Sequence, residues 1–588
     1  MGQFIKFVFA TIVGLFLFLV IIISIFVGVL SSSSSEKEDK LSDNSVLKLN
    51  IDKQIIERES DDIFSKFRGS LTSSDEGGLG LLELRQSIKK AATDSKIKGI
   101  FLELNDIHNG FASTEELRNS LIEFKKSGKF IVAYAESYSE ISFYLASVAD
   151  RIFLPSSGDL EFNGINVEMM YFKGTLEKLG IEPEVFKVGQ YKSAVEPFTN
   201  DKMSDANRTQ IKSFIGSLYG YYLANVALAR KLNADSLKSI SDNMLIRSAD
   251  DALKYKLVTD VGYFDEAVAA IKEKLHIAKT EKFPLVSYAA YRKDLNLEEK
   301  DEEEDKSSKI AVIFASGDIH QGKGDENTIG SESVAEELRK ARLDDKVKAI
   351  VLRINSPGGS ALASDIIWRE VVLAKNAKPI IASMSDVAAS GGYYIAMGCD
   401  AIVADPTTIT GSIGVFGLLF NSDKFLKDKL GITTDRQATG KFSGIQTFTR
   451  ELTQEEKDII QKEVERIYSD FTSKAAKGRK MSVDSLHAIA QGRVWSALEA
   501  KQIGLVDELG GLEYAIKLAA KKASITTYHT DYLPEQKNLF FKEFLSELGE
   551  EEGVNSELSK LYPYLKSIKN IQKLEGIQAR MPYELSVH

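Results

Sequence analysis

Residues 379–396 combine a candidate nucleophile with a turn that would present it to a substrate. The apolar run 380–384 is typical of a buried strand, and 393–397 suits a buried helix. Ser390 stands between them and is followed by two glycines. A serine at a tight turn from strand to helix is well placed to attack, because free N–H groups lie at the helix start and glycine permits close approach. A glycine-rich turn whose serine only caps the helix is the other interpretation.

Acyl transfer requires a base and an oxyanion hole in addition to the nucleophile. The N–H of Gly391, with that of Gly358 or Gly359 in a Ser-Pro-Gly-Gly loop, is suited to hold an oxyanion. The six histidines are scattered, and none lies in a setting typical of a catalytic base. A lysine can replace histidine when burial lowers its pKa toward neutrality.

The elements around Ser390 recur in the first half of the chain, at an offset close to 250 residues. Residues 98–105 match 348–355, and 144–152 match 394–402. Each half alternates short apolar strands with helical stretches, which is the pattern of a parallel α/β fold. The sequence therefore predicts a tandem duplication of one α/β domain.

The 588 residues exceed a single core, so several domains are expected. A run of acidic residues between the two halves is typical of a solvated linker. We expect an anchor with a serine-rich linker at 1–44, a first α/β repeat at 45–295, an acidic linker at 296–308, a second α/β repeat at 309–530 and a helical tail at 531–588.

The two repeats differ at the positions that carry chemistry. The first repeat has Glu140 where the second has Ser390, and it lacks the glycine loop. Conversely, Lys192 of the first repeat aligns with Phe442 of the second. Drift in surface loops would explain either difference alone. If both repeats shared one site, each could lose the residues that the other supplies, which is the pattern seen here. The residues around Lys192 are apolar enough to bury it: Tyr191, Ala194, Val195 and Phe198.

The N-terminus carries a candidate membrane segment. Residues 7–30 are 24 positions without a charge, enough to span a bilayer as a helix. Lys6 precedes this run, and the weak positive-inside signal places the N-terminus in the cytoplasm and both repeats outside. A cleaved signal peptide is the alternative, but the run is long for that purpose and no clear small-residue cleavage site follows.

Composition excludes several other classes of function. The net charge of −10 argues against nucleic acid as the main partner. A single cysteine can form neither an intrachain disulfide nor a cysteine-ligated zinc site. The histidines show no metal-ligand spacing, and no phosphate-binding loop is present. We therefore expect no metal and no cofactor.

Four motifs together resemble one protease family. They are Gly-Gln-Tyr-Lys-Ser-Ala-Val-Glu-Pro-Phe at 189–198, Asn-Ser-Pro-Gly-Gly at 355–359, Ala-Ala-Ser-Gly-Gly-Tyr-Tyr at 388–394 and Thr-Gly-Ser-Ile-Gly at 410–414. The sequence resembles the SppA family of signal peptide peptidases in its long, duplicated form. The resemblance covers nearly the whole chain and implies a Clp-protease/crotonase type of fold.

The resemblance also implies a mechanism and a setting. In the family, a serine of the second repeat is the nucleophile and a lysine of the first is the base, which matches Ser390 and Lys192. The serine of the Thr-Gly-Ser-Ile-Gly motif, here Ser412, contacts that lysine. The resemblance implies a homotetramer on the outer face of the bacterial inner membrane that degrades released signal peptides. Val387, Leu362 and Tyr393 are candidates for apolar substrate pockets or for core positions.

Two other functions remain open at this stage. A crotonase-like enzyme would use the glycine loop to polarise a thioester, and a membrane-anchored scaffold would use the repeats for assembly alone. The sequence does not indicate the cleavage preference, the number of subunits or the role of the tail. It also leaves open whether Lys192 serves Ser390 of its own chain or of a neighbour.

Overall fold

A computed structural model describes residues 40–59, 78–105, 109–294, 308–325, 327–535 and 576–581, with three single positions before residue 40. The expected membrane segment, 7–30, therefore lies outside the described residues apart from two of these positions. Within the part that is described, no helix is long and apolar enough to cross a bilayer.

The first repeat is built on a six-stranded sheet in which every strand pair is parallel. Its spatial order is β10 (Asp260–Val261), β7 (Arg151–Leu154), β5 (Phe130–Tyr134), β4 (Ile97–Leu104), β1 (Ser45–Ile51) and β11 (Leu285–Ser287). Helices α3 (Leu81–Thr93), α4 (Phe111–Lys125) and α5 (Glu140–Ala146) pack on one face, and α11 (Phe264–Leu275) on the other.

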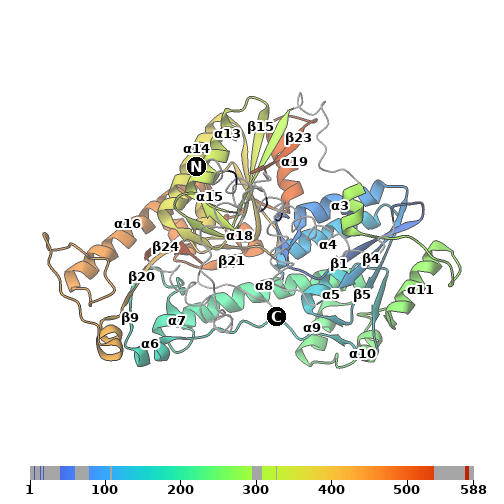
Figure 1. Cartoon of the computed structure of the whole chain (residues 1–588), viewed down its shortest axis with the longest axis horizontal. Helices are drawn as coiled ribbons and strands as arrows, with labels where there is room; N and C mark the ends of the chain where they lie inside the picture. Colours follow the sequence, from blue (N-terminus) through green and yellow to red (C-terminus); the bar gives the residue numbers. More distant parts are fainter. Residues whose placement is uncertain are drawn as a thin grey trace.

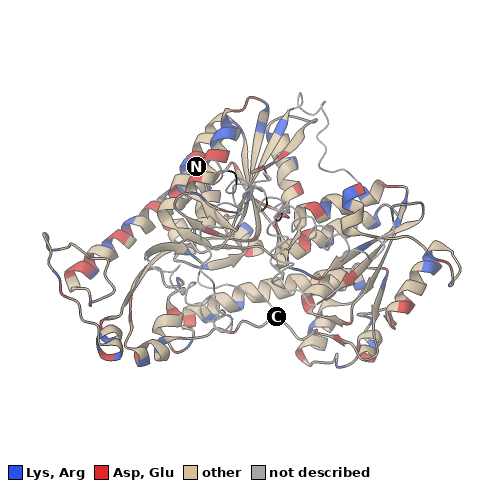
Figure 2. Ribbon diagram, viewed as in Figure 1, with Lys and Arg blue, Asp and Glu red and all other residues tan. Residues whose placement is uncertain are grey.

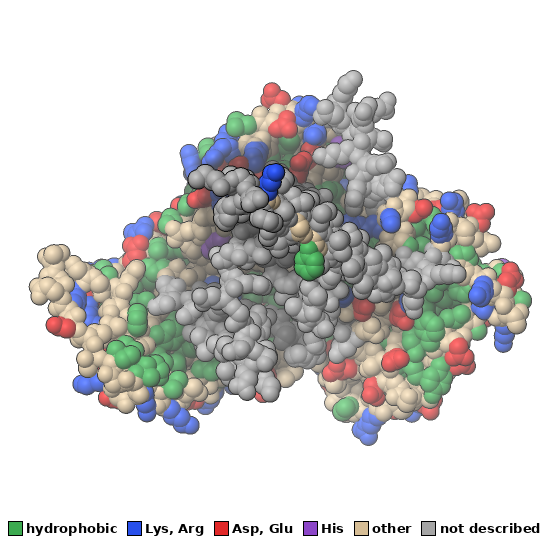
Figure 3. Space-filling view, viewed as in Figure 1, with side chains coloured by type: hydrophobic (Ala, Val, Ile, Leu, Met, Phe, Trp, Pro, Cys, Tyr) green, Lys and Arg blue, Asp and Glu red, His purple; other side chains and the backbone are tan. Residues whose placement is uncertain are grey.

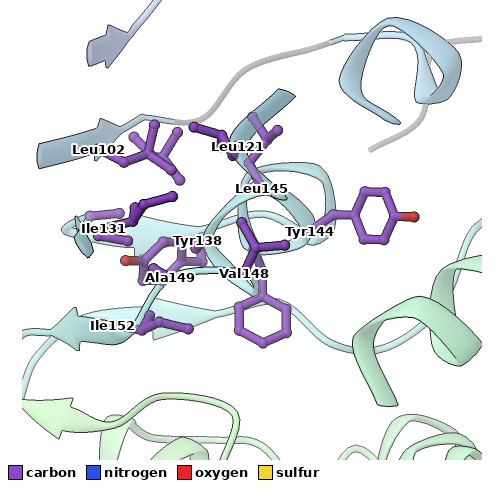
Figure 4. Packing of buried hydrophobic residues seen from close by; sticks show 14 of the residues in the cluster. Leu102, Leu121, Ile131, Tyr138, Tyr144, Leu145, Val148, Ala149 and Ile152 are labelled. Carbon is purple, nitrogen blue, oxygen red and sulfur yellow. The ribbon is translucent and has the colours of Figure 1, made fainter. Parts of the chain in front are cut away.

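Successive residues of the central strands enter different cores, as expected for a sheet covered on both faces. Leu102 lies in the larger cluster with Leu121 and Ile131, while the preceding Phe101 lies in the smaller cluster beneath α11. Figure 4 shows the larger cluster, in which side chains from the strands meet Leu145 of α5.

The second repeat has the same strand order. It runs β22 (Glu508–Leu509), β18 (Ala401–Ala404), β17 (Ile380–Ala389), β15 (Val347–Ser356), β12 (Lys309–Ser316) and β23 (His529–Leu533), all parallel. Near its end β17 also pairs with β19 (Ile409–Gly411), which continues to β21 (Val494–Ser496). Helices α13 (Ser331–Leu343), α14 (Ala361–Ala377), α15 (Gly391–Ala396) and α19 (Leu512–Lys522) cover this sheet. The predicted duplication of an α/β domain is confirmed.

The C-terminal boundary differs from the expectation. β23 occupies the place that β11 has in the first repeat, so the second sheet extends past residue 530 into the segment we expected to be a helical tail. The described end of the tail is also a strand, β24 (Gly576–Arg580). The rest of the expected helical tail, 536–575 and 582–588, falls outside the described residues.

A third sheet joins the repeats. Its order is β14 (Thr328–Gly330), β13 (Asp318–His320), β16 (Gly358–Ser360), β24, β20 (Val415–Asn421) and β9 (Glu182–Val188). Only β9 comes from the first repeat, and it runs antiparallel to β20 over the whole of both strands. Figure 1 shows this sheet beside α6 (Lys173–Leu179) and α16 (Gln454–Arg479), while the long helix α8 (Asp205–Arg230) runs beneath both repeats.

A buried arginine also connects the repeats. Arg353 on β15 is fully buried and forms ion pairs with Glu57, at 2.8 Å, and with Glu116, at 2.7 Å, both from the first repeat. Elsewhere the charges alternate in sign along the outer helices, as Figure 2 shows for α16. The inner charges therefore fix how the repeats meet, whereas the outer ones are solvated.

Candidate active site

Ser390 lies at the turn between β17 and α15, as the sequence predicts. Its backbone has φ 54° and ψ −110°, a conformation that non-glycine residues seldom adopt. The turn is held from both sides, since the Ser390 N–H donates to the Gly411 carbonyl at 2.8 Å and the Tyr394 N–H donates to the Ser390 carbonyl at 2.8 Å. The surrounding strands thus impose a strained turn that directs the hydroxyl inward.

At the corresponding position of the first repeat, the structure has a helix start without such a turn. Glu140, the counterpart of Ser390, lies inside α5, which begins after the cap residue Ser139. Its buried carboxylate accepts backbone N–H bonds from Asn163, at 2.9 Å, and Gly164, at 2.7 Å. Burial raises the pKa of Glu140 to about 7. This position anchors a loop and presents no nucleophile.

The pairing of β9 with β20 carries Lys192 into the second repeat. Val188, at the end of β9, pairs with Val415, at the start of β20. The residues just after β9 and just before β20 therefore meet. The Lys192 Nζ lies 2.9 Å from the Ser390 Oγ, 3.1 Å from the Ser412 Oγ and 3.3 Å from the Ser412 carbonyl oxygen. The three residues nominated from the sequence for nucleophile, base and support are brought together within one chain.

The surroundings of Lys192 favour its neutral form. The side chain is fully buried, and its Nζ lies 5.9 Å from the centre of the Phe416 ring. Burial lowers the pKa of Lys192 well below its ordinary value, because an ammonium group loses most of its hydration there. A neutral amine can accept the proton of the Ser390 hydroxyl.

Gly391 and Gly358 meet beside Ser390. Gly391 begins α15, so its N–H has no acceptor within the helix. A Cβ on Gly358 would lie 2.8 Å from the Gly391 nitrogen, and its own φ of 106° is accessible mainly to glycine. The Gly358 N–H donates to the Ser356 Oγ at 3.2 Å, which leaves Gly391 as the better-placed oxyanion donor. Gly359, with φ 151°, continues the strand.

Gly492 is a site residue that the sequence did not suggest. Its φ is 79°, and a Cβ there would lie 2.7 Å from the Lys192 Cβ. The neighbouring Gln491 accepts a hydrogen bond from the Tyr191 N–H at 3.0 Å. A lone glycine in a loop carries no signal of this role, because the contact joins residues 300 positions apart, 492 against 192.

A cluster of buried polar side chains packs against the loop that carries Lys192 and holds it in place. The Ser193 Oγ donates to Asn207 at 2.9 Å and accepts from Gln210 at 2.8 Å. Gln210 also accepts from the Val494 N–H at 3.1 Å, which ties α8 to β21. Because all three side chains are buried, the loop that carries Lys192 has little freedom.

The three residues that the sequence offered for substrate pockets lie in different environments. Tyr393 is a core residue, with its hydroxyl donating to the Leu505 carbonyl at 3.0 Å. Leu362 is exposed on α14, whereas Val387 is partly buried next to Ile409 near the end of β17. Among the described residues, no group of three or more His, Cys, Asp or Glu side chains is arranged to hold a metal ion.

Comparison with known proteins identifies the family. The model of peptidase family S49 matches residues 123–278 and 373–526, one range in each repeat. "Protease 4" of Haemophilus influenzae is 32% identical over 584 residues, covering 95% of this chain and 92% of that protein. "Serine protease SPPA, chloroplastic" of Arabidopsis thaliana is 36% identical over 523 residues, covering 87% and 75%. The chain belongs to peptidase family S49.

Membership of this family makes the protein a serine protease, which decides against both the scaffold and the thioester enzyme. "Protease 4" of Salmonella typhi is a further relative, 36% identical over 466 residues that cover 78% of this chain and 74% of that protein. A solved structure, a ClpP1 mutant from Listeria monocytogenes, matches 35% of this chain and 94% of its own at 16% identity, with a TM-score of 0.24. A score this low supports no conclusion about the fold.

Proposed function

We propose that this serine protease is an endopeptidase in which Ser390 is the nucleophile and Lys192 the general base. The observation that carries the proposal is the contact of 2.9 Å between a fully buried lysine amine and a serine hydroxyl at a strained turn. The Ser390 Oγ attacks the substrate carbonyl and its proton passes to the Lys192 Nζ. The ammonium then protonates the departing amine, and water hydrolyses the acyl-enzyme by the same route.

Two groups assist this dyad in the proposal. Ser412 contacts Nζ through both its hydroxyl and its carbonyl oxygen, which holds the amine toward Ser390. The Gly391 N–H, at the positive end of α15, stabilises the negative charge on the tetrahedral intermediate. Because both members of the dyad come from one chain here, we propose that each subunit carries a complete site.

Hydrolysis of an apolar fluorogenic peptide tests the dyad. We expect Ser390→Ala and Lys192→Ala each to lose about 10³-fold or more in kcat, since the nucleophile and its base act as a unit. Lys187→Ala is the matched control, because Lys187 is exposed on the neighbouring strand β9. Near-normal turnover by a folded Lys192→Ala variant would place the base elsewhere.

We also propose that residues 7–30 anchor the chain in the bacterial inner membrane by a single helix, with both repeats on the outer side. The length of the uncharged run and the lysine before it support this arrangement. The substrates would be signal peptides already released into the membrane. Sedimentation with membranes, and digestion of both repeats by protease added outside spheroplasts, test the anchor and its orientation.

Assembly into a homotetramer completes the proposal. In the first repeat, the arm formed by residues 172–200 packs onto the second repeat, and Phe198 is only 4% exposed. The corresponding arm of the second repeat, 422–450, lies on the surface, where the matching Phe448 is 56% exposed. Figure 3 shows exposed hydrophobic side chains at the lower left, and Leu430 and Ile432 of this arm are also exposed.

The first repeat offers a matching edge for this arm. Residues 165–171 correspond to β20 by the 250-residue offset, form no helix, and have no strand partner among the described residues. The second-repeat arm of one copy would pair there on the next copy, as β9 pairs with β20. Such a head-to-tail contact closes into a ring when the rotation between successive copies returns to the first copy, and we propose that it does so after four copies. We expect the double variant Phe448→Asp with Ile432→Asp to give single chains in mass photometry. Leu228→Asp is the control, because Leu228 is also exposed but lies outside the arm, and it should leave the tetramer intact.

A further inference from the structure

Arg493 contacts two aromatic side chains that belong to opposite sides of the dyad. It stands directly before β21, next to the glycine that packs against the lysine loop. Its guanidinium carbon lies 3.8 Å from the centre of the Trp495 ring and 5.3 Å from the centre of the Tyr191 ring. A guanidinium group is planar and weakly hydrated, so it packs on aromatic rings more readily than an ammonium group does. Arg493 therefore links the lysine loop to β21.

Tyr191 belongs to the side of the base, because it directly precedes Lys192 in the chain. Its N–H donates to the Gln491 carbonyl at 3.0 Å, and its carbonyl accepts a hydrogen bond from the Gln210 side chain at 3.1 Å. These two bonds hold its backbone, whereas Arg493 packs against its ring. A shift of the Tyr191 ring would be passed on to the next residue, so the contact with Arg493 restrains Lys192.

Trp495 belongs to the side of the nucleophile. It pairs with Thr410 in β19, and a Cβ built on Gly411 would lie 2.8 Å from its indole ring. The Gly411 carbonyl is the group that accepts the Ser390 N–H and holds the strained turn. The indole is itself fixed, since its N–H donates to the Ile489 carbonyl at 3.1 Å. The Trp495 ring therefore packs on the strand that holds the nucleophile.

The backbone of Arg493 also holds the third residue of the site. Its carbonyl accepts the Ser412 N–H at 2.7 Å, and its own N–H donates to the Ala490 carbonyl at 3.0 Å. The Arg493 Nε is buried and has no hydrogen-bond partner among the described residues. Burial alone lowers the pKa of Lys192, with no contribution from a charged side chain in the part of the chain that is described. Arg493 therefore acts on the site through packing rather than through its charge.

We propose that Arg493 is a positioning residue that fixes the distance between the Lys192 amine and the Ser390 hydroxyl. It does so by packing against Tyr191 on one side and Trp495 on the other. This role rests on the proposed function, in which Lys192 is the base for Ser390. Without the guanidinium group the lysine loop gains freedom, and the contact of 2.9 Å between amine and hydroxyl is no longer held. Proton transfer requires that contact, so kcat falls while the binding of a peptide is unchanged.

The pH profile of kcat/KM for an apolar fluorogenic peptide tests this role on the full chain. We expect Arg493→Ala to lower kcat about tenfold at unchanged KM. Water that enters beside the loosened lysine stabilises its ammonium form, so the acidic limb of the profile should move to higher pH by about one unit. Arg493→Lys keeps the charge and the aliphatic stem but lacks the planar group. It should change both quantities in the same direction by a smaller amount.

A double variant tests the route through Tyr191. Tyr191→Leu should lower kcat by a similar factor, and adding Arg493→Ala to it should lower kcat further by less than about twofold, because the contact is already lost. Lys254→Ala is the matched control. Lys254 is exposed, and its amine lies 5.1 Å from the centre of the Tyr255 ring, far from the dyad in the chain. This variant should keep the kcat and the pH profile of wild type.

Three results would overturn the role of Arg493 and leave the dyad standing. The first is a wild-type kcat and pH profile in both Arg493 variants. The second is a lower kcat with an unmoved acidic limb, which would make Arg493 a residue that only supports the fold. The third is independent losses from Arg493→Ala and Tyr191→Leu that multiply in the double variant. A wild-type profile that does not rise with pH contradicts the proposed dyad, and the role of Arg493 with it.

Discussion

At the scale of single residues, the chemistry depends on the charge state of one buried amine. Lys192 is surrounded by backbone, two serine hydroxyls and the Phe416 ring, and burial lowers the pKa of its amine. Below that lowered pKa the amine is protonated and cannot accept the Ser390 proton. Above it the amine is neutral and can act as a base.

Activity should therefore rise with pH. We expect kcat/KM for a peptide to increase through the lowered pKa of Lys192 and to reach a plateau below the ordinary lysine range. The measurement is a pH profile of kcat/KM on folded protein. A profile that is flat from mildly acidic to alkaline pH would mean that a group other than Lys192 accepts the proton.

The same burial also makes the stability of the fold depend on pH. Between the lowered pKa and the ordinary value of 10.5, the unfolded chain binds a proton that the folded chain does not. The contribution of Lys192 to the free energy of unfolding therefore increases as pH rises through this window. We expect Lys192→Met to be more stable than wild type at neutral pH, with the difference shrinking toward pH 10.5. Denaturant midpoints at several pH values measure this, and a variant less stable at neutral pH contradicts it.

Ser390 was the most predictable residue, because a strand, a serine and two glycines follow each other directly in the sequence. Lys192 could be nominated from the comparison of the two repeats and from the family resemblance, since its neighbours by themselves do not mark a catalytic base. Gly492 could not be nominated at all, because its role is a contact in space and nothing in its local sequence marks it.

At the scale of elements, the site depends on close backbone packing between the lysine loop and the loop before β21. Gly492→Ala would place a Cβ 2.7 Å from the Lys192 Cβ and force the loop to move. We expect a loss of about 1–3 kcal/mol in stability and at least about tenfold in kcat. Activity assays and thermal unfolding report the two effects.

Gly128→Ala is the matched control for this variant. Gly128 also has a positive φ, 84°, but a Cβ there meets nothing within 4 Å. We expect it to lose about 1 kcal/mol in stability and to keep full kcat. If both alanine variants keep full kcat, the packing of Gly492 against Lys192 does not position the base.

The parallel strands of each repeat could be predicted from short apolar runs in the sequence, whereas the strand pairing of the third sheet could not. β9 and β20 are separated by more than two hundred residues, and their antiparallel pairing has no period that a sequence could show. β24 lies in a segment we expected to be helical, and its pairing with β16 and β20 decides its conformation.

At the scale of the whole molecule, the two repeats form one site only if they keep a fixed arrangement. The similarity between the two halves of the sequence predicted the duplication. Nothing in the sequence around Arg353 indicated that this residue joins the two repeats. Arg353 is fully buried and paired with Glu57 and Glu116. Removing it takes the arginine away from the buried Glu57 carboxylate and leaves Glu116 with Arg85 alone.

We expect Arg353→Ala to cost about 3–5 kcal/mol in stability, because removing one partner of a buried ion pair leaves the other charge buried and uncompensated. Arg466→Ala is the control, since Arg466 is exposed and paired with Glu463 along one helix, and it should cost under about 0.5 kcal/mol. Denaturant unfolding of the two variants makes the comparison. Equal stabilities would mean that the arginine does not hold the repeats together.

The central claim is that a lysine of one repeat activates a serine of the other. The most direct test is the rate at which a fluorophosphonate labels the protein, with the modified residue located by mass spectrometry. We predict a single label on Ser390 in wild type and labelling slower by about 10³-fold in folded Lys192→Met. Labelling of that variant at the wild-type rate, or labelling of a different serine, would contradict the claim.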